Sequence, residues 1–169
     1  LLNVCKKLKN KNKNIQFVLG VAKYIKIKQW IIPDWIYINK DSPQKALECA
    51  DLALVASGTA TVEAAIFGTP MIIIYKMSSL TWWISKVLVK VKYAGMVNII
   101  ANSMIMPEIL QSKATPNNIY NVAIKIISNK IILEKMKSDL ILVQNLLKGS
   151  SQLKSASDYI IELNKKNEI

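Results

Sequence analysis

Histidine and arginine are both missing from this sequence of 169 residues, and only two cysteines are present. Without histidine, the chain alone cannot form a Ser-His-Asp triad, a Cys-His nucleophile pair or an HExxH zinc site. Cys5 and Cys49 have no metal-ligand spacing and no signal peptide opens the chain, so a reducing cytoplasm is expected. These absences exclude the common hydrolase and zinc-enzyme classes for this chain alone, and no metal is predicted.

The lack of arginine also bears on the formal charge of +12, because all 23 basic residues are lysines. A strong positive charge is typical of proteins that bind nucleic acid or an anionic membrane. Base edges and bidentate phosphate contacts favour arginine, however, and these lysines are scattered from Lys6 to Lys166. We therefore expect no nucleic-acid partner, whereas a weak attraction to a membrane surface stays open.

Long hydrophobic runs are missing as well. The longest, such as 71–75, are far shorter than the roughly 18 residues that suggest a membrane-spanning helix, so no span is predicted. Position 1 is not methionine, and the pattern is already helical over residues 1–9. We therefore expect the chain to begin inside a larger protein.

Apolar residues make up 51% of the chain, enough for a substantial core. Short apolar runs without polar alternation are typical of strands in a parallel sheet that is covered on both faces. We expect such strands at 15–21, 35–38, 52–56 and 71–75. Because helical patterns alternate with them, the fold class predicted is α/β, a Rossmann-like parallel sheet flanked by helices.

Helix boundaries are indicated by capping residues, prolines and glycines. Asp41-Ser42-Pro43 predicts a helix over 44–50, and Thr115-Pro116 predicts one over 117–128. A helix over 59–67 is closed by Gly68 and Pro70. Further helices are expected over 80–92 and through the final third, 107–163, with a break at Gly149-Ser150.

One stretch, residues 50–63, joins a strand, a turn of small residues and the start of a helix. The first amides of a helix lack partners and the helix dipole adds positive charge, so such a turn is suited to phosphate. Gly58 lets a diphosphate approach the backbone, while Ser57 and Thr59 offer hydroxyl groups.

Glu63 lies four residues after Thr59, about one helical turn further on, so both side chains can project from one side. A carboxylate there can accept hydrogen bonds from the two hydroxyls of a ribose. The structural alternative is that Ser57 caps the helix and Glu63 stabilises its dipole, an effect of about 0.3 to 1 kcal/mol.

A series of motifs extends this local pattern. The series comprises Ala56-Ser57-Gly58-Thr59-Ala60-Thr61-Val62-Glu63-Ala64-Ala65, Gly68-Thr69-Pro70-Met71, Thr81-Trp82-Trp83-Ile84-Ser85-Lys86, Asn98-Ile99-Ile100-Ala101 and Pro107-Glu108-Ile109-Leu110-Gln111. Across most of residues 15–130 the chain resembles the lipid-A-disaccharide synthases. This ordered series is far more specific than the Ser-Gly-Thr turn alone.

The resemblance implies a GT-B glycosyltransferase, of which this chain is the C-terminal half. Residues 1–130 would form the Rossmann-like UDP-sugar-binding domain and 131–169 the C-terminal helices, with the N-terminal acceptor domain absent. The implied reaction transfers 2,3-diacylglucosamine from UDP to 2,3-diacylglucosamine 1-phosphate at the cytoplasmic face of the inner membrane. No metal or cofactor is expected, the catalytic base would lie in the missing half, and homo-oligomer formation is left open.

The resemblance also assigns roles to residues. Glu63 would bind the donor ribose, Ser57, Gly58 and Thr59 the diphosphate, and Asn98 the donor pocket. Lys76, just after a strand, is either a phosphate contact or a solvated lysine.

Two positions depart from the family. The family usually has glycine and arginine where this chain has Asn102-Ser103, and proline where it has Val97. An arginine contact is therefore lost or supplied elsewhere.

The segment 80–92 supports two interpretations. Trp82 and Trp83 interleave with Lys86 and Lys90 as in a helix that lies on an anionic bilayer. The same pattern fits an amphipathic helix that packs its apolar side on the sheet. Two functional alternatives also stay open, namely another UDP-sugar-dependent GT-B enzyme (transferase or epimerase) and a membrane-surface binding module without catalysis.

Overall fold

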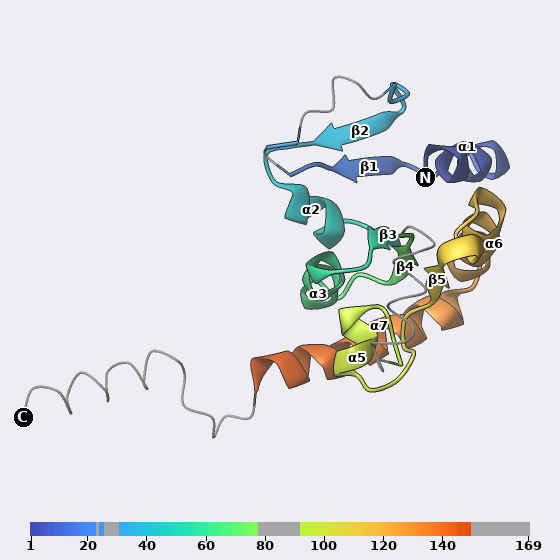
Figure 1. Ribbon diagram of the computed structural model, residues 1–169. Coiled ribbons are helices and arrows are strands. Elements are labelled where there is room, and N and C mark those ends of the chain that lie inside the picture. The colour runs from blue at the N-terminus through green and yellow to red at the C-terminus, as the bar shows by residue number, and fades with distance from the viewer. Residues whose placement is uncertain (23, 26–30, 78–91, 150–169) are drawn as a thin grey trace, which may run out of the picture.

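The computed structural model describes residues 1–22, 24–25, 31–77 and 92–149, shown as coloured ribbon in Figure 1. The elements are α1 (Leu2–Lys11), β1 (Phe17–Gly20), β2 (Ile36–Asn39), α2 (Pro43–Glu48), β3 (Ala53–Ala56), α3 (Thr59–Ile66), β4 (Met71–Tyr75), α5 (Met96–Ile100), β5 (Glu108–Leu110), a 3-10 turn (Gln111–Lys113), α6 (Pro116–Ile127) and α7 (Lys130–Lys148). The helix predicted over 80–92, with Trp82, Trp83, Lys86 and Lys90, lies outside the described residues apart from its last position.

All the strand pairs of the described residues are parallel, which confirms the α/β class. β1 pairs with β2 in one sheet, and β3, β4 and β5 form a second sheet in that order. In the second sheet Ala56 is opposite Ile74, and Tyr75 is opposite Leu110. The carboxyl ends of β3, β4 and β5 therefore share one edge.

The hydrophobic core is built around β4. Met71, Ile72 and Ile73 have no exposed surface, because β4 is the central strand and helices cover it on both sides. Figure 1 shows α2 and α3 to one side of the three-stranded sheet and α1 and α6 to the other. The long helix α7 adds Met136, Leu140 and Val143 to the same core. Each such side chain, fully buried, contributes about 1.5 to 3 kcal/mol.

Two sequence predictions about the sheet were wrong. Residues 108–110 were expected to be helical but form β5, because Ile109 fills the core beside β4 and three residues are too few to show a period of two. The runs at 15–21 and 35–38 were expected to be covered on both faces. Val18 is instead 50% exposed and Tyr37 68% exposed, since helices cover only one face of β1 and β2.

Helix boundaries follow the expected chemistry with one exception. The Thr115 hydroxyl accepts a hydrogen bond from the Asn118 amide at the start of α6, and Pro116 occupies the first turn. Asn129 caps α7 in the same way, by accepting from two amides. Ser42, expected with Asp41 and Pro43 to start α2, makes no side-chain capping bond. Its amide donates a hydrogen bond to Asn39 Oδ1 at 3.0 Å.

Candidate functional site

The turn between β3 and α3 has a backbone conformation that depends on glycine. The Ser57 amide donates to the Ile74 carbonyl at 3.0 Å, which extends the β3–β4 pairing by one residue. Gly58 then adopts φ 138° and ψ −158°, a region open almost only to glycine. Among the residues that the structure describes, a Cβ atom at Gly58 would meet nothing within 4 Å, so on this side the turn is open to a ligand.

The first amides of α3 are without acceptors. Among the hydrogen bonds of the described residues, none is donated by the amides of Gly58, Thr59 or Ala60. The Gly58 carbonyl, in contrast, is held twice, by the Thr61 amide at 3.1 Å and the Thr61 hydroxyl at 2.8 Å. The 58–59 peptide group is therefore fixed, while the amides of Gly58, Thr59 and Ala60 point away from the body of the helix. This arrangement suits an anion.

The opposite end of α3 is fully engaged. The Gly68 and Thr69 amides donate to the Ala65 and Ala64 carbonyls, each at 2.9 Å. The Gln144 side chain, which comes from α7, donates to the carbonyls of Ala65 at 2.9 Å and Ile66 at 3.0 Å. The unpaired backbone groups of α3 are therefore concentrated at the edge where β3 and β4 end.

Thr59 and Glu63 share the exposed face of α3, whereas Thr61, Ala64 and Ala65 are buried against the core. The carboxylate of Glu63 thus lies on the same side of the helix as Thr59, as the spacing predicts, and is in contact with solvent. Lys76 follows β4 directly and is exposed. Within the described part of the chain, the Thr59, Glu63 and Lys76 side chains form no hydrogen bond or ion pair, so all three are free to meet a ligand.

The Ser57 hydroxyl has a protein partner. It donates to the Ala94 carbonyl at 2.6 Å, across 37 residues of sequence. A serine hydroxyl has a single hydrogen, so in this arrangement none remains for a phosphate oxygen. In the structure, Ser57 attaches the turn to the segment 92–95. The contact of Ser57 with a diphosphate stays a prediction.

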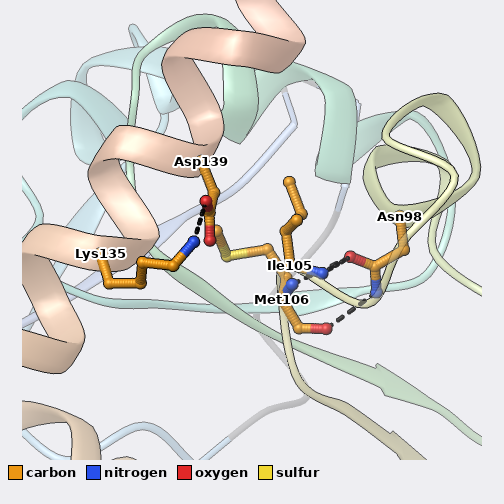
Figure 2. Close-up of polar contacts among 5 residues, drawn as sticks. All are labelled: Asn98, Ile105, Met106, Lys135 and Asp139. Atoms are coloured by element: carbon orange, nitrogen blue, oxygen red, sulfur yellow. Dashed lines mark hydrogen bonds and ion pairs between the residues drawn. The ribbon is translucent and has the colours of Figure 1, made fainter.

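Asn98 lies in the core with no exposed surface, and its carboxamide is fully hydrogen-bonded, as Figure 2 shows for three of its four contacts. Its Oδ1 accepts from the Ile105 amide at 3.1 Å and the Met106 amide at 2.9 Å. Its Nδ2 donates to the Met106 carbonyl and to Glu108 Oε1, both at 2.8 Å. The side chain therefore closes the loop between α5 and β5, and its predicted place in the donor pocket stays untested by these contacts.

Glu108 is a residue of this network that sequence reasoning did not single out. Its Oε2 accepts from the Ala94 amide, and its Oε1 accepts from the Gly95 amide, each at 2.9 Å. It lies in the stretch Pro107-Glu108-Ile109-Leu110-Gln111, whereas its partners at 94, 95 and 98 lie just before and within α5. Nothing in the spacing of residues could have indicated this contact.

Gln111, directly after β5, is a second such residue. Its backbone has φ 51°, and its Nε2 is buried without a hydrogen-bond partner among the described residues. Its Oε1 accepts from the Met77 amide at 3.3 Å, which links the residues that follow β4 and β5. Strained backbone at the carboxyl edge of a parallel sheet is common near ligand sites.

Asn102 and Ser103, the positions at which the resemblance expects glycine and arginine, follow α5. Asn102 is exposed with φ 48°, a left-handed conformation that asparagine tolerates better than most residues. Ser103 beside it is also exposed, and its amide donates to the Asn98 carbonyl at 3.2 Å. Asparagine therefore suits this backbone position, and the expectation about the arginine stays a prediction.

Two further findings concern classes of site. Within residues 1–22, 24–25, 31–77 and 92–149, no group of three or more potential metal ligands lies together. No helix in the same ranges is both long enough and apolar enough to cross a bilayer.

The Lys135–Asp139 ion pair, also drawn in Figure 2, lies within α7 and joins residues one turn apart.

Comparison with known proteins gives one family. The family model described as lipid-A-disaccharide synthetase matches residues 1–160. The lipid-A-disaccharide synthase of Sulfurihydrogenibium sp. (strain YO3AOP1) is 38% identical over 124 residues, which are 73% of this chain and 32% of that protein. The one of Dechloromonas aromatica (strain RCB) is 44% identical over 87 residues, 52% of this chain and 23% of that protein.

A longer match of lower identity is found with the lipid-A-disaccharide synthase of Nitrosococcus oceani, 29% over 159 residues, which are 90% of this chain and 41% of that protein. The chain thus spans well under half the length of these curated relatives. The family-model match over residues 1–160 includes the β3–α3 turn, Asn98 and Glu108. The chain therefore belongs to the lipid-A-disaccharide synthetase family.

Proposed function

We propose that this chain is the donor-nucleotide part of a glycosyltransferase that moves 2,3-diacylglucosamine from UDP to 2,3-diacylglucosamine 1-phosphate in lipid A biosynthesis. Family membership supports the reaction, because the matching relatives are named lipid-A-disaccharide synthases. The observation that carries the role of this part is the free amino end of α3, with Glu63 exposed one turn along.

The diphosphate of UDP binds at the amides of Gly58, Thr59 and Ala60, which have no other acceptor among the described residues. These donors are fixed before the ligand arrives, because Thr61 holds the Gly58 carbonyl. As the glycosidic bond to UDP breaks, negative charge grows on the departing phosphate, and donors already in place stabilise that charge without rearranging. Lys76 adds a positive charge at the same edge.

Glu63 accepts hydrogen bonds from the two ribose hydroxyls, which places the nucleoside along α3 while the diphosphate lies at its end. A carboxylate beside a diphosphate would repel it if it had no other partner, and vicinal hydroxyls provide that partner. The acceptor and the group that takes its proton belong to the part of the protein that lies beyond the matched third of the relatives. This chain supplies recognition of the leaving group.

Titration calorimetry with UDP on the full chain tests the proposal. Glu63→Ala removes charge-assisted hydrogen bonds, so we expect UDP to bind about 10- to 100-fold more weakly. Glu134→Ala is the matched control, because Glu134 is exposed on α7, paired only with Lys137 at 3.6 Å. Equal affinities for Glu63→Ala and the unsubstituted chain would remove the ribose contact from the proposal.

Both substrates of the proposed reaction carry acyl chains, so we further propose that the protein works at the cytoplasmic surface of the inner membrane. The net charge of +12 supports attraction to anionic lipid. Sedimentation with vesicles of anionic phospholipid, at low and high salt, tests this. Binding should fall with salt and with Trp82→Ala combined with Trp83→Ala, and absence of binding at low salt would contradict it.

A further inference from the structure

The carboxylate of Glu108 gathers three donors that lead to the nucleotide turn. Its Oε2 receives the Ala94 amide, while its Oε1 receives the Gly95 amide and the Asn98 side chain. The carbonyl of Ala94 in turn receives the Ser57 hydroxyl at 2.6 Å. One continuous set of hydrogen bonds therefore runs from β5, through residues 94 and 95, to the residue that opens the β3–α3 turn.

The path is short and tightly packed. Gly95 lies so close to β4 that a Cβ atom there would be 2.3 Å from Ile73 Cδ1 and 3.3 Å from Glu108 Oε1. Ile73 is fully buried, so the backbone at 94–95 rests against a rigid part of the core. Glu108 itself is fixed by the pairing of β5 with β4. A shift of the Glu108 carboxylate would therefore be passed to the 94–95 peptide group, whose N–H (Gly95) donates to Glu108 and whose C=O (Ala94) accepts from Ser57.

We propose that Glu108 is a positioning residue for the donor nucleotide: it holds the amides of Ala94 and Gly95, orients the Ala94 carbonyl that accepts from Ser57, and thereby sets the place of the free amides at Gly58 and Thr59. This inference rests on the proposed function, since it concerns the same UDP site. Glu108 does not touch UDP. Its effect on affinity passes through Ser57 alone, so the two residues act as one unit.

The substitution Glu108→Gln isolates the proposed link. The glutamine has the same shape, and its single acceptor oxygen can keep the Gly95 amide and the Asn98 side chain. Its NH₂ group then faces the Ala94 amide, donor against donor, so the hydrogen bond lost is the one from residue 94, whose carbonyl accepts from Ser57. By calorimetry on the full chain we expect UDP to bind about tenfold more weakly. Glu134→Gln, the same change on α7, should leave UDP affinity unchanged.

A double-mutant cycle separates positioning from a general loss of stability. Ser57→Ala breaks the last link of the path and should also weaken UDP about tenfold. If Glu108 acts through Ser57, the double variant should bind UDP no more weakly than whichever single variant binds it more weakly. A double variant about a hundredfold weaker, the product of the two effects, would overturn the inference. Ile109→Val lowers stability on the same strand without touching these hydrogen bonds, so it should leave UDP affinity unchanged.

The outcomes distinguish this inference from the proposed function. An unsubstituted chain that does not bind UDP contradicts the proposed function itself. Binding that Glu63→Ala weakens and Glu108→Gln leaves intact overturns only the positioning role. If Glu108→Gln does not fold, NMR on the unsubstituted chain decides. The Ala94 and Gly95 amide resonances should shift on UDP addition together with those of Gly58 and Thr59, and unmoved Ala94 and Gly95 resonances would refute the link.

Discussion

Gly58 lies in the β3–α3 turn, and Gly95 follows Ala94, which is hydrogen-bonded to that turn. Glycine is required at the two positions for different physical reasons. Gly58 has room for a side chain and a backbone conformation that disfavours one, with φ 138°. Gly95 has an ordinary φ of −88° and no room, because Ile73 Cδ1 occupies the place of a Cβ atom. The first restriction is conformational and the second is steric.

This difference predicts different responses to a second substitution. Gly58→Ala should lower the free energy of unfolding by about 1 to 3 kcal/mol, the usual range for strained backbone. Gly95→Ala should cost a similar amount through overpacking, about 1 to 3 kcal/mol. Ile73→Val removes the clashing methyl group, so it should recover part of the loss at Gly95 and none at Gly58. Urea unfolding of the three single and two double variants measures this, and equal recovery at both glycines would show that the distinction is wrong.

The two cysteines should differ in reactivity. Burial raises the pKa of the Cys5 thiol, so less thiolate is present at mildly alkaline pH, while Cys49 is exposed. We expect a maleimide to modify Cys49 first and Cys5 severalfold more slowly, as followed by mass spectrometry of the two tryptic peptides. Faster labelling of Cys5 would mean that α1 opens readily.

The raised pKa of Cys5 also links stability to pH. The folded chain holds the neutral thiol, so this contribution is complete below the pKa of the unfolded thiol and is lost as the pH rises toward the folded pKa. Cys5→Ala should therefore flatten the fall of the unfolding free energy on the alkaline side. An unchanged alkaline slope in urea titrations would contradict this assignment.

At the scale of elements, the helix caps give a matched comparison. Thr115 accepts a hydrogen bond from the first turn of α6, whereas Ser42 precedes α2 without a side-chain bond. Thr115→Ala should cost about 1 kcal/mol of unfolding free energy, and Ser42→Ala should be close to neutral. Both changes remove one hydroxyl, and Thr115→Ala also removes an exposed methyl group, so chemical denaturation of the two variants compares a hydroxyl that caps with one that does not. Similar losses in both would show that the sequence expectation for Ser42 was sound after all.

The elements that could be predicted from the sequence are those with strong local signals. β3, α3 and β4 were found because continuous apolar runs are separated by Gly58, Gly68 and Pro70, which restrict the backbone locally. β5 was missed because three residues show no period, and α5 because five residues give less than two turns. Local pattern therefore located the β3–α3 turn well.

What the sequence did not reveal is the support of that turn. The contacts of Ser57 with Ala94 and of Glu108 with Ala94 and Gly95 join segments that the fold brings together. A glutamate that follows a proline, as Glu108 does, fits many local structures. No rule of sequence spacing predicts that its carboxylate accepts from three amide groups. Asn98 was predicted from family resemblance, but its four internal hydrogen bonds could only come from the arrangement of the loop around it.

At the scale of the whole molecule, ligand binding and folding should be linked. A ligand that binds only the folded chain raises the unfolding free energy by about 2.7 kcal/mol at a concentration of one hundred times its Kd. For a chain of this length, UDP should then raise the midpoint of thermal unfolding by roughly 5 to 10 °C. At the same UDP concentration, Glu63→Ala should show a much smaller rise. Differential scanning fluorimetry measures both, and an equal rise in the variant would speak against a ribose contact.

The contrast between the two ends of α3 has a further consequence for motion. Gln144, Gly68 and Thr69 hold one end, whereas nothing among the described residues holds the amides at the other. Hydrogen exchange in the free chain should therefore be fastest at Thr59 and Ala60 and slowest toward Ala65. A bound nucleotide would act as the missing cap, so exchange at these two amides should slow when UDP is added.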